Sequence, residues 1–226
     1  MTEKQIQSRF LIATAFVFAG VQTAACTPAN PLGVDFSCPV PTSPAMQHDF
    51  DIARLNDLVY LGSLLEEYRA ATGAYPFAVD SSVPTYIHIA TREQQESITG
   101  GPPYEHRVKD VTELSAELER VLDRSVEMPF DPQRVPDSKP NFYIYMVADG
   151  FYYLAVHLHE AFPFSQRVAE CYYKVELTNY PRPPAGAWNL MELMTDGDFA
   201  SAIARTANNP GYVEGLRTQI REDGAF

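Results

Sequence analysis

The chain has 226 residues, enough for one medium-sized domain with an appendage, and its 46% hydrophobic content is sufficient for a real core. This content excludes a chain that is disordered throughout. The formal net charge of −12, from 17 Lys and Arg against 29 Asp and Glu, describes a surface that repels phosphate backbones. We therefore expect no nucleic-acid partner.

The first 25 residues have the order of an export leader. Lys4 and Arg9 form a basic start, residues 10–21 are an apolar run, and small residues follow up to Cys26. The apolar run is too short to span a bilayer comfortably as a permanent helix. We interpret residues 1–25 as a leader that directs the chain out of the cytosol.

The four residues Thr23-Ala24-Ala25-Cys26 resemble the box read by the bacterial lipoprotein processing machinery. This resemblance implies that Cys26 is acylated, becomes the first mature residue and attaches the protein to a membrane. The protein would then lie in the bacterial cell envelope, facing the periplasm or the cell surface. Two alternatives remain: an ordinary secretory peptide cleaved near Ala25, and an uncleaved membrane anchor.

The chain has three cysteines, and assigning Cys26 to lipid leaves Cys38 and Cys171 as a candidate disulfide. Disulfides persist in the compartment that the leader indicates. A bridge that closes a loop of more than one hundred residues would stabilise the fold by about 4 to 5 kcal/mol in the chain-entropy model. The alternative is two free thiols.

Residues 26–46 are interpreted as a tether, because prolines recur there among small polar residues. The prolines are Pro28, Pro31, Pro39, Pro41 and Pro44. A long amphipathic helix is predicted from Asp49 to Ala71, ended by Gly73 and Pro76. The apolar stripe of this helix is Ile52, Leu55, Leu58, Val59, Leu61, Leu65 and Tyr68. Its charged residues, including Asp51, Arg54 and Asp57, are expected mostly off the stripe.

Later elements are predicted to be a helix and several strands. Residues 85–89 favour a short strand, and Asp110 with Glu113 is typical of the start of a second helix that runs to Leu122. A hairpin is expected from 142–147 and 152–159 around the turn Asp149-Gly150, with a third strand over 171–177.

The order of these pieces resembles the periplasmic domain of type IV pilin-like proteins, most closely the major pseudopilins of type II secretion. The resemblance rests on four pieces: the long helix, Thr72-Gly73-Ala74-Tyr75-Pro76 after it, the second helix running into Met128-Pro129-Phe130-Asp131-Pro132, and the hairpin. It covers residues 49–160. It implies an α+β fold in which the first helix packs on an antiparallel sheet, giving a pilin-like domain over 47–180.

The chain departs from this family in two respects. The family's cleavage site and the long apolar helix that follows it, which packs the filament core, have no counterpart here. We therefore carry over the fold and not polymerisation, and a filament subunit with an unusual leader is the alternative. The family's calcium loop has no match either, because Asp131, Asp137 and Asp149 are scattered and the turn explains Asp149.

His157 and His159 are the candidate metal ligands, since residues two apart on a strand share a face. Leu154, Val156 and Leu158 would face the core, so we expect the histidines on the wet face of the sheet. A third ligand at recognisable spacing is missing, and the sequence lacks a nucleophile elbow, a phosphate loop and a His-Glu-x-x-His motif. We expect neither metal nor cofactor and no enzyme, with an envelope hydrolase or metal-handling protein as a further class.

Residues 181–226 are expected to form a C-terminal extension of two short helices after the boundary at Pro181-Arg182-Pro183-Pro184. The apolar residues of this extension either pack against the sheet or dock on an envelope partner. The sequence as a whole favours a non-enzymatic envelope lipoprotein that acts as a binding or structural component. Its partners would be the membrane, through the lipid anchor, and an envelope protein.

Overall fold

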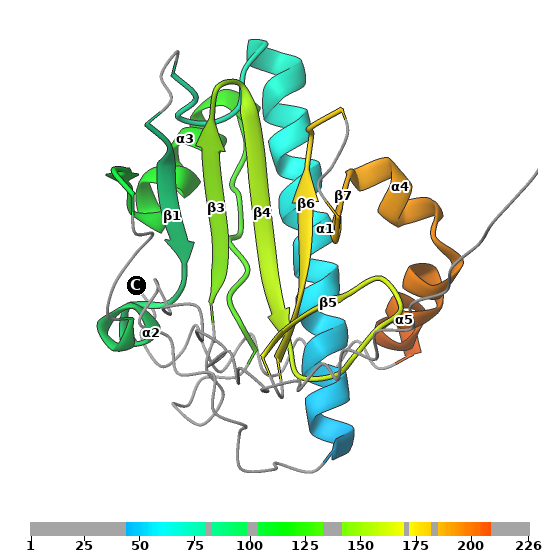
Figure 1. Cartoon of the computed structure of the whole chain (residues 1–226). Helices are drawn as coiled ribbons and strands as arrows, with labels where there is room; N and C mark the ends of the chain where they lie inside the picture. Colours follow the sequence, from blue (N-terminus) through cyan, green and yellow to red (C-terminus); the bar gives the residue numbers. More distant parts are fainter. Residues whose placement is uncertain are drawn as a thin grey trace, which may run out of the picture.

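A layer of helices packs on one face of a sheet in the structure of the chain (Figure 1). The structure is a computed structural model that describes residues 44–79, 83–98, 104–132, 142–169, 172–181 and 185–208. It confirms the expected α+β class, with a helix first and most strands later. The predictions for Cys26, Cys38 and Cys171 lie outside the described residues.

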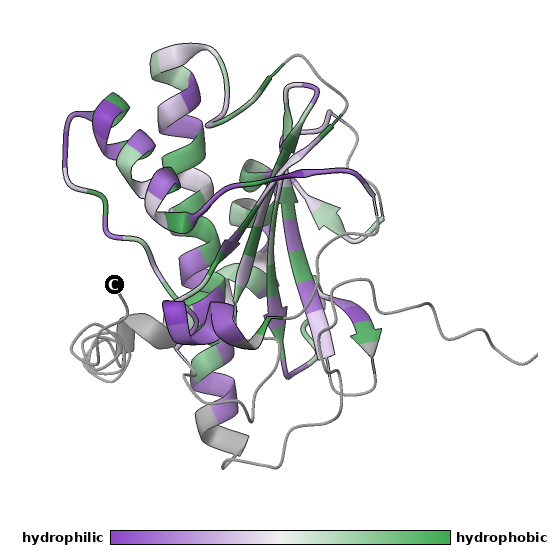
Figure 2. Ribbon diagram, turned by 90° about the vertical axis from the view of Figure 1, so that its left-hand side faces the viewer, coloured by the Kyte–Doolittle hydropathy of each residue, from purple (hydrophilic) through white to green (hydrophobic). Residues whose placement is uncertain are grey.

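The long helix α1 runs from Pro44 to Thr72, so it begins five residues before the predicted start. Its apolar stripe lies in the core, where Leu55 and Leu58 are fully buried. The edge-on view of Figure 2 shows α1 on one side of the sheet. Gly73 ends the helix as predicted, with φ +83° and its N–H donated to the Arg69 carbonyl at 2.7 Å. None of the described helices combines the length and apolar character needed to cross a membrane.

Three charged residues of α1 are buried, and the prediction that they lie off the stripe was wrong. Asp51 and Arg54 are 0% exposed and Asp57 is 2% exposed. They recur at intervals of three and therefore share one face of the helix. The reason is that α1 contacts elements on more than one side: β4 beneath it, α3 on one flank, and α4 and α5 on the other (Figure 1).

Within the described residues, the sheet has seven strands in the order β2-β1-β3-β4-β6-β5, with β7 beside β6. The strands are β1 (Thr85–Ile89), β2 (Arg107–Val108), β3 (Tyr143–Ala148), β4 (Phe151–Leu158), β5 (Gln166–Ala169), β6 (Tyr172–Thr178) and β7 (Ala187–Trp188). The central strands β1, β3, β4 and β6 are antiparallel, as expected. The two-residue strands β2 and β7 pair in parallel, which makes the whole sheet mixed.

The hairpin of β3 and β4 confirms the turn read from the sequence. Asp149 and Gly150 have φ values of +48° and +76°, the two positive angles of a type I′ turn. Ala148 pairs with Phe151 next to this turn. Along β3, Tyr143, Tyr145 and Val147 are buried on the side of α1, so the strand's pleat fixes which side chains meet the helix.

Two shorter helices on the β1 side of the sheet have reciprocal capping boxes at their starts. In α3 (Val111–Leu122), Asp110 and Glu113 form the predicted box. In α2 (Arg92–Ser97), Thr91 and Gln94 form a second box, and this helix was not predicted. Both helices connect strands on the β1 side of the sheet (Figure 1).

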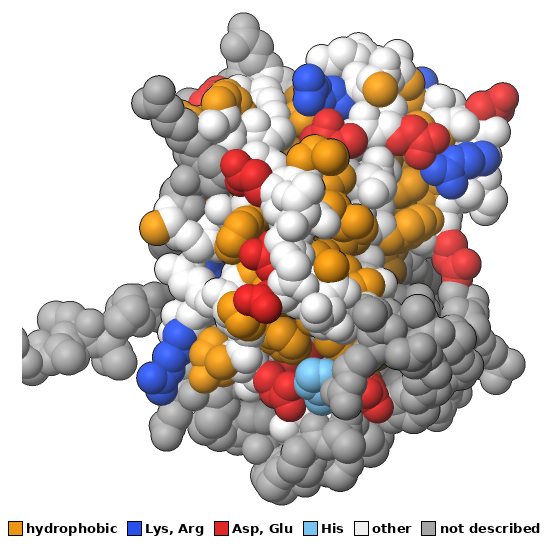
Figure 3. Space-filling model, turned by 90° about the vertical axis from the view of Figure 1, so that its right-hand side faces the viewer, with side chains coloured by type: hydrophobic (Ala, Val, Ile, Leu, Met, Phe, Trp, Pro, Cys, Tyr) orange, Lys and Arg blue, Asp and Glu red, His pale blue; other side chains and the backbone are white. Residues whose placement is uncertain are grey.

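The described part of the C-terminal extension packs into the same core as α1. It forms α4 (Leu190–Thr195) and α5 (Gly197–Asn208), in which Leu193 is 0% and Phe199 1% exposed. On the outside of α4, Met191 and Met194 remain exposed, and Figure 3 shows hydrophobic and acidic side chains intermingled on this face of the molecule. The further apolar positions Tyr212, Val213, Leu216 and Ile220 lie outside the described residues.

Candidate functional site

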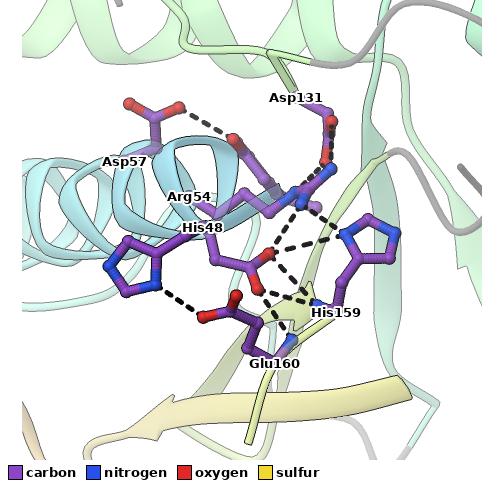
Figure 4. Close-up of polar contacts among 8 residues, drawn as sticks. His48, Arg54, Asp57, Asp131, His159 and Glu160 are labelled. Carbon is purple, nitrogen blue, oxygen red and sulfur yellow. Dashed lines mark hydrogen bonds and ion pairs between the residues drawn. The ribbon is translucent and has the colours of Figure 1, made fainter. Parts of the chain in front are cut away.

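A buried ionic cluster joins α1 to two other parts of the chain (Figure 4). We call Asp51, Arg54, Asp131 and His159 the Arg54 cluster. Arg54 donates two parallel hydrogen bonds to Asp131, from Nε to Oδ2 at 2.7 Å and from Nη2 to Oδ1 at 2.8 Å. Its Nη1 donates to Asp51 Oδ1 at 2.7 Å. A guanidinium fork on a carboxylate is the strongest geometry for such a pair.

Asp51 holds the end of β4 as well as Arg54. Its carboxylate accepts the backbone N–H of His159 at 2.9 Å and that of Glu160 at 2.8 Å. Both N–H groups follow the last residue of the strand, where the ladder no longer supplies acceptors. Asp51 thus fixes the first turns of α1 to the end of β4.

The His159 ring takes part as a neutral acceptor. Its Nδ1 lies 2.9 Å from Arg54 Nη1, and a guanidinium can only donate. The ring proton must therefore be on Nε2. Beside the cluster, His48 Nδ1 lies 2.5 Å from Glu160 Oε2, so the first turn of α1 makes a second polar contact with the segment after β4 (Figure 4).

The guanidinium of Arg54 lies between two carboxylates inside the core, and Asp51 also accepts two backbone N–H groups. Burial alone would lower the pKa of Arg54, but the neighbouring carboxylates of Asp131 and Asp51 outweigh it and raise that pKa above its ordinary value. One turn further along α1, Asp57 accepts a hydrogen bond from the Tyr143 hydroxyl at 2.7 Å. Burial and the charge of Asp57 raise the pKa of Tyr143 well above its ordinary value, which keeps the hydroxyl protonated as the donor.

The two candidate metal ligands do not lie on a wet face, and that expectation was wrong. His157 is 6% exposed and its ring lies 6.3 Å from that of Phe142, while the His159 side chain is 4% exposed. Burial, with the charges of Lys174 and Arg54, lowers the pKa of His157 to about 3. His159 lies beyond the end of β4, so the two-residue spacing does not place both histidines on one strand face as a pair of metal ligands. Among the described residues, no three His, Cys, Asp or Glu side chains gather as metal ligands would.

Sequence reasoning missed the role of Asp131. One sequence feature did point to Asp131: it is an acidic residue between Pro129 and Pro132, in a segment whose prolines oppose regular secondary structure. Spacing alone could not identify its partner, since 77 residues separate Asp131 from Arg54.

The contacts of the Arg54 cluster hold α1, the end of β4 and the segment after α3 together. Arg54 and Asp51 contact each other, Asp131 and the segment that begins at His159, and both side chains are 0% exposed. Comparison of the chain with protein-family models, with curated proteins and with solved structures found no match. We therefore interpret the Arg54 cluster from its geometry alone, as a clamp that fixes the start of α1 to the rest of the domain.

Proposed function

We propose that this chain is a non-enzymatic lipoprotein of the bacterial cell envelope. Its pilin-like domain would act as a binding or structural component of a secretion or pilus-type assembly. In this proposal Cys26 carries the lipid, the proline-rich segment is the tether and the domain reaches an envelope partner.

The observation that carries the proposal is the clamp at the start of α1. The proline-rich segment leads directly into this helix, so a pull from the membrane would be applied at its first turns. Those turns hold the Arg54 cluster and the contact between His48 and Glu160, which bind α1 to β4 and to the segment after α3. A domain anchored through its N-terminal end needs that end to be the part fixed most firmly.

The pilin-like reading draws support from the segment after α1. Tyr75, in the quoted Gly-Ala-Tyr-Pro stretch, donates its hydroxyl to Glu66 at 2.8 Å and stacks edge-on against Tyr152 of β4. The Pro76 carbonyl accepts the Tyr145 hydroxyl at 2.8 Å. These residues tie the end of α1 to the central hairpin, which is the pairing of elements that the resemblance implies.

A filament subunit is the alternative. The family packs its filaments through a long apolar helix that has no counterpart in this sequence, so α1 would have to replace it. Here α3 covers one flank of α1, and α4 with α5 covers the other. The strip left exposed carries Tyr60, Ser63 and Glu67, which is mostly polar.

The lipid anchor is tested by labelling cells with a fatty-acid probe and isolating the protein. The wild-type chain and Cys38→Ser should carry label and sediment with membranes, whereas Cys26→Ser should do neither. Cys38→Ser is the control for the loss of a nearby thiol, and its far-UV circular dichroism is recorded because it also removes the candidate disulfide to Cys171. Equal labelling of wild type and Cys26→Ser would overturn the lipoprotein proposal, and fibres containing the protein in electron micrographs would favour the alternative.

A further inference from the structure

A pocket lies beside β1, on the side of the strand that faces away from α1. It encloses about 420 Å³, which falls within the range of small-molecule sites. Its lining residues include Tyr86, His88, Gln95, Ile98, His106 and Lys109. Tyr86 and His88 alternate along β1 with Ile87 and Ile89, whose side chains belong to the core under the sheet. The lining residues come from β1, α2, β2 and the start of α3, so the pocket lies at the β2 edge of the sheet.

Two buried polar atoms of the lining have no hydrogen-bond partner in the described part of the chain. They are the Tyr86 hydroxyl and Nε2 of His88. Tyr86 is only 4% exposed, so bulk water does not compensate its hydroxyl. An unsatisfied buried hydroxyl is costly, and such groups in native proteins call for an explanation. A ligand that pairs with both atoms would provide one.

The other polar groups of the pocket offer both acceptors and donors. His106 Nδ1 lies 2.7 Å from the carbonyl oxygen of Tyr104, so Nδ1 carries a proton, and the neutral tautomer has its lone pair on Nε2. Gln95 donates one side-chain N–H to the Ala90 carbonyl at 3.1 Å, which leaves its Oε1 as an acceptor and its second N–H as a donor. A hydroxyl group, which both donates and accepts hydrogen bonds, fits these groups.

The charges of the lining are already paired within the first turn of α3. Lys109 Nζ lies 2.5 Å from Glu113 Oε1, and Asp110 Oδ1 accepts from the N–H and the hydroxyl of Thr112 at 2.7 and 2.8 Å. Burial, and then the proximity of His106, lowers the pKa of His88 to about 4, so this ring is neutral at physiological pH. The lining thus favours neither a phosphate or carboxylate nor a cationic amine.

We propose that this pocket binds an uncharged, hydroxyl-rich ring of the size of a sugar unit. The ligand's hydroxyls donate to the imidazole nitrogens of His88 and His106 and pair with the Tyr86 hydroxyl. The rings of Tyr86, His88 and His106 meet edge-on at centroid distances of 4.9 and 5.8 Å and supply flat contacts for the ligand's C–H groups. The site is independent of the lipid anchor, because none of its residues belongs to the leader or tether.

The test is ligand-observed NMR of the full-length chain with a panel of probes at millimolar concentration. The panel holds glucose, galactose, N-acetylglucosamine and their methyl glycosides, with inorganic phosphate and choline as charged probes. We expect at least one sugar to bind and the two charged probes not to bind. If the methyl glycoside binds as well as the free sugar, the site accepts a sugar unit within a glycan.

Tyr86→Phe and Tyr152→Phe form the matched pair of variants. Both tyrosines have buried hydroxyls without a described partner, but Tyr152 lies on the α1 side of the sheet, away from the pocket. Tyr86→Phe should weaken sugar binding about fivefold, the equivalent of one hydrogen bond, and Tyr152→Phe should leave it unchanged. Binding of phosphate or choline but of no sugar, binding of nothing, or equal weakening by the two variants would overturn the proposal.

Discussion

Arg54 on α1 and Asp131 after α3 are joined by two parallel hydrogen bonds inside the core, at 2.7 and 2.8 Å. Removing Asp131 takes away the bidentate partner of a buried guanidinium and leaves Asp51 as its remaining carboxylate in the Arg54 cluster. We predict that Asp131→Ala lowers the free energy of unfolding by about 3 to 5 kcal/mol. Urea denaturation followed by far-UV circular dichroism measures this loss.

The double variant Arg54→Met with Asp131→Leu separates two effects on the free energy of unfolding: the loss caused by leaving one charge without its partner, and the net contribution of the ion pair itself. Replacing two paired charges by apolar groups of similar size is often close to neutral. Asp51 would still lose its contact with the guanidinium, but it keeps the backbone N–H groups of His159 and Glu160. The double variant should therefore be more stable than Arg54→Met alone. If it is less stable, the account of the cluster as a compensated pair is wrong.

Tyr143 and Tyr152 provide a comparison of a paired and an unpaired hydroxyl in one core. The Tyr143 hydroxyl donates to the Asp57 carboxylate, whereas the Tyr152 hydroxyl has no partner among the described residues. Tyr143→Phe should cost about 1.5 to 3 kcal/mol of unfolding free energy, since it removes a bond to a charged group. Tyr152→Phe should be neutral or slightly stabilising. Equal losses in the two denaturation curves would contradict this.

Stability should fall in mild acid because of His88 and His157. Burial lowers the pKa of these side chains to about 4 and about 3, below the unfolded value near 6.5. Between these values the unfolded chain binds more protons than the folded chain. The stabilising contribution is thus complete above about pH 6.5 and declines as the pH falls toward 4 and 3, by at most about 2.7 kcal/mol per pH unit for the two groups.

The urea midpoint measured from pH 7 to pH 4 checks this prediction. His157→Phe should show a shallower decline than the wild-type chain, because it removes one of the two groups. Met191→Ala is the control, since this position is 70% exposed and carries no titratable group. A wild-type midpoint that does not change over this range would contradict the prediction.

Phe199 tests whether the described C-terminal helices contribute to the stability of the domain. Its ring is 1% exposed and lies edge-on to Phe164 at a centroid distance of 5.1 Å. Phe199→Ala should cost about 3 to 5 kcal/mol of unfolding free energy, the range for truncating a buried aromatic ring. Met191→Ala, at a position that is 70% exposed, should change little. Thermal unfolding that does not distinguish the two variants would contradict the packing of α5.

The elements that the sequence predicted are those specified by local patterns. The capping box at Asp110 and the Asp149-Gly150 turn each depend on a few neighbouring residues, and both are confirmed. The helix α2 had a comparable box at Thr91 and Gln94, which was overlooked because its six residues carry no apolar periodicity. The strands β2 and β7 have two residues each and arise only from their neighbours, so no local pattern indicates them.

The Arg54 cluster could not be predicted, because a charged residue is ordinarily assigned to a solvated face. Burial of Asp51 and Arg54 depends on partners more than seventy residues away, and periodicity does not encode those partners. The same holds for His157, whose polar character suggested the wet face while the packing of Phe142 buries it. Only the tertiary contacts show which distant residues pair with the buried charged and polar side chains of this fold.

The attachment of the chain through Cys26 is tested most directly by mass spectrometry of the N-terminal peptide of the protein extracted from membranes. The account predicts a peptide that begins at Cys26 and carries the added mass of acyl chains. A peptide that retains residues 1–25, or that contains an unmodified Cys26, would contradict it.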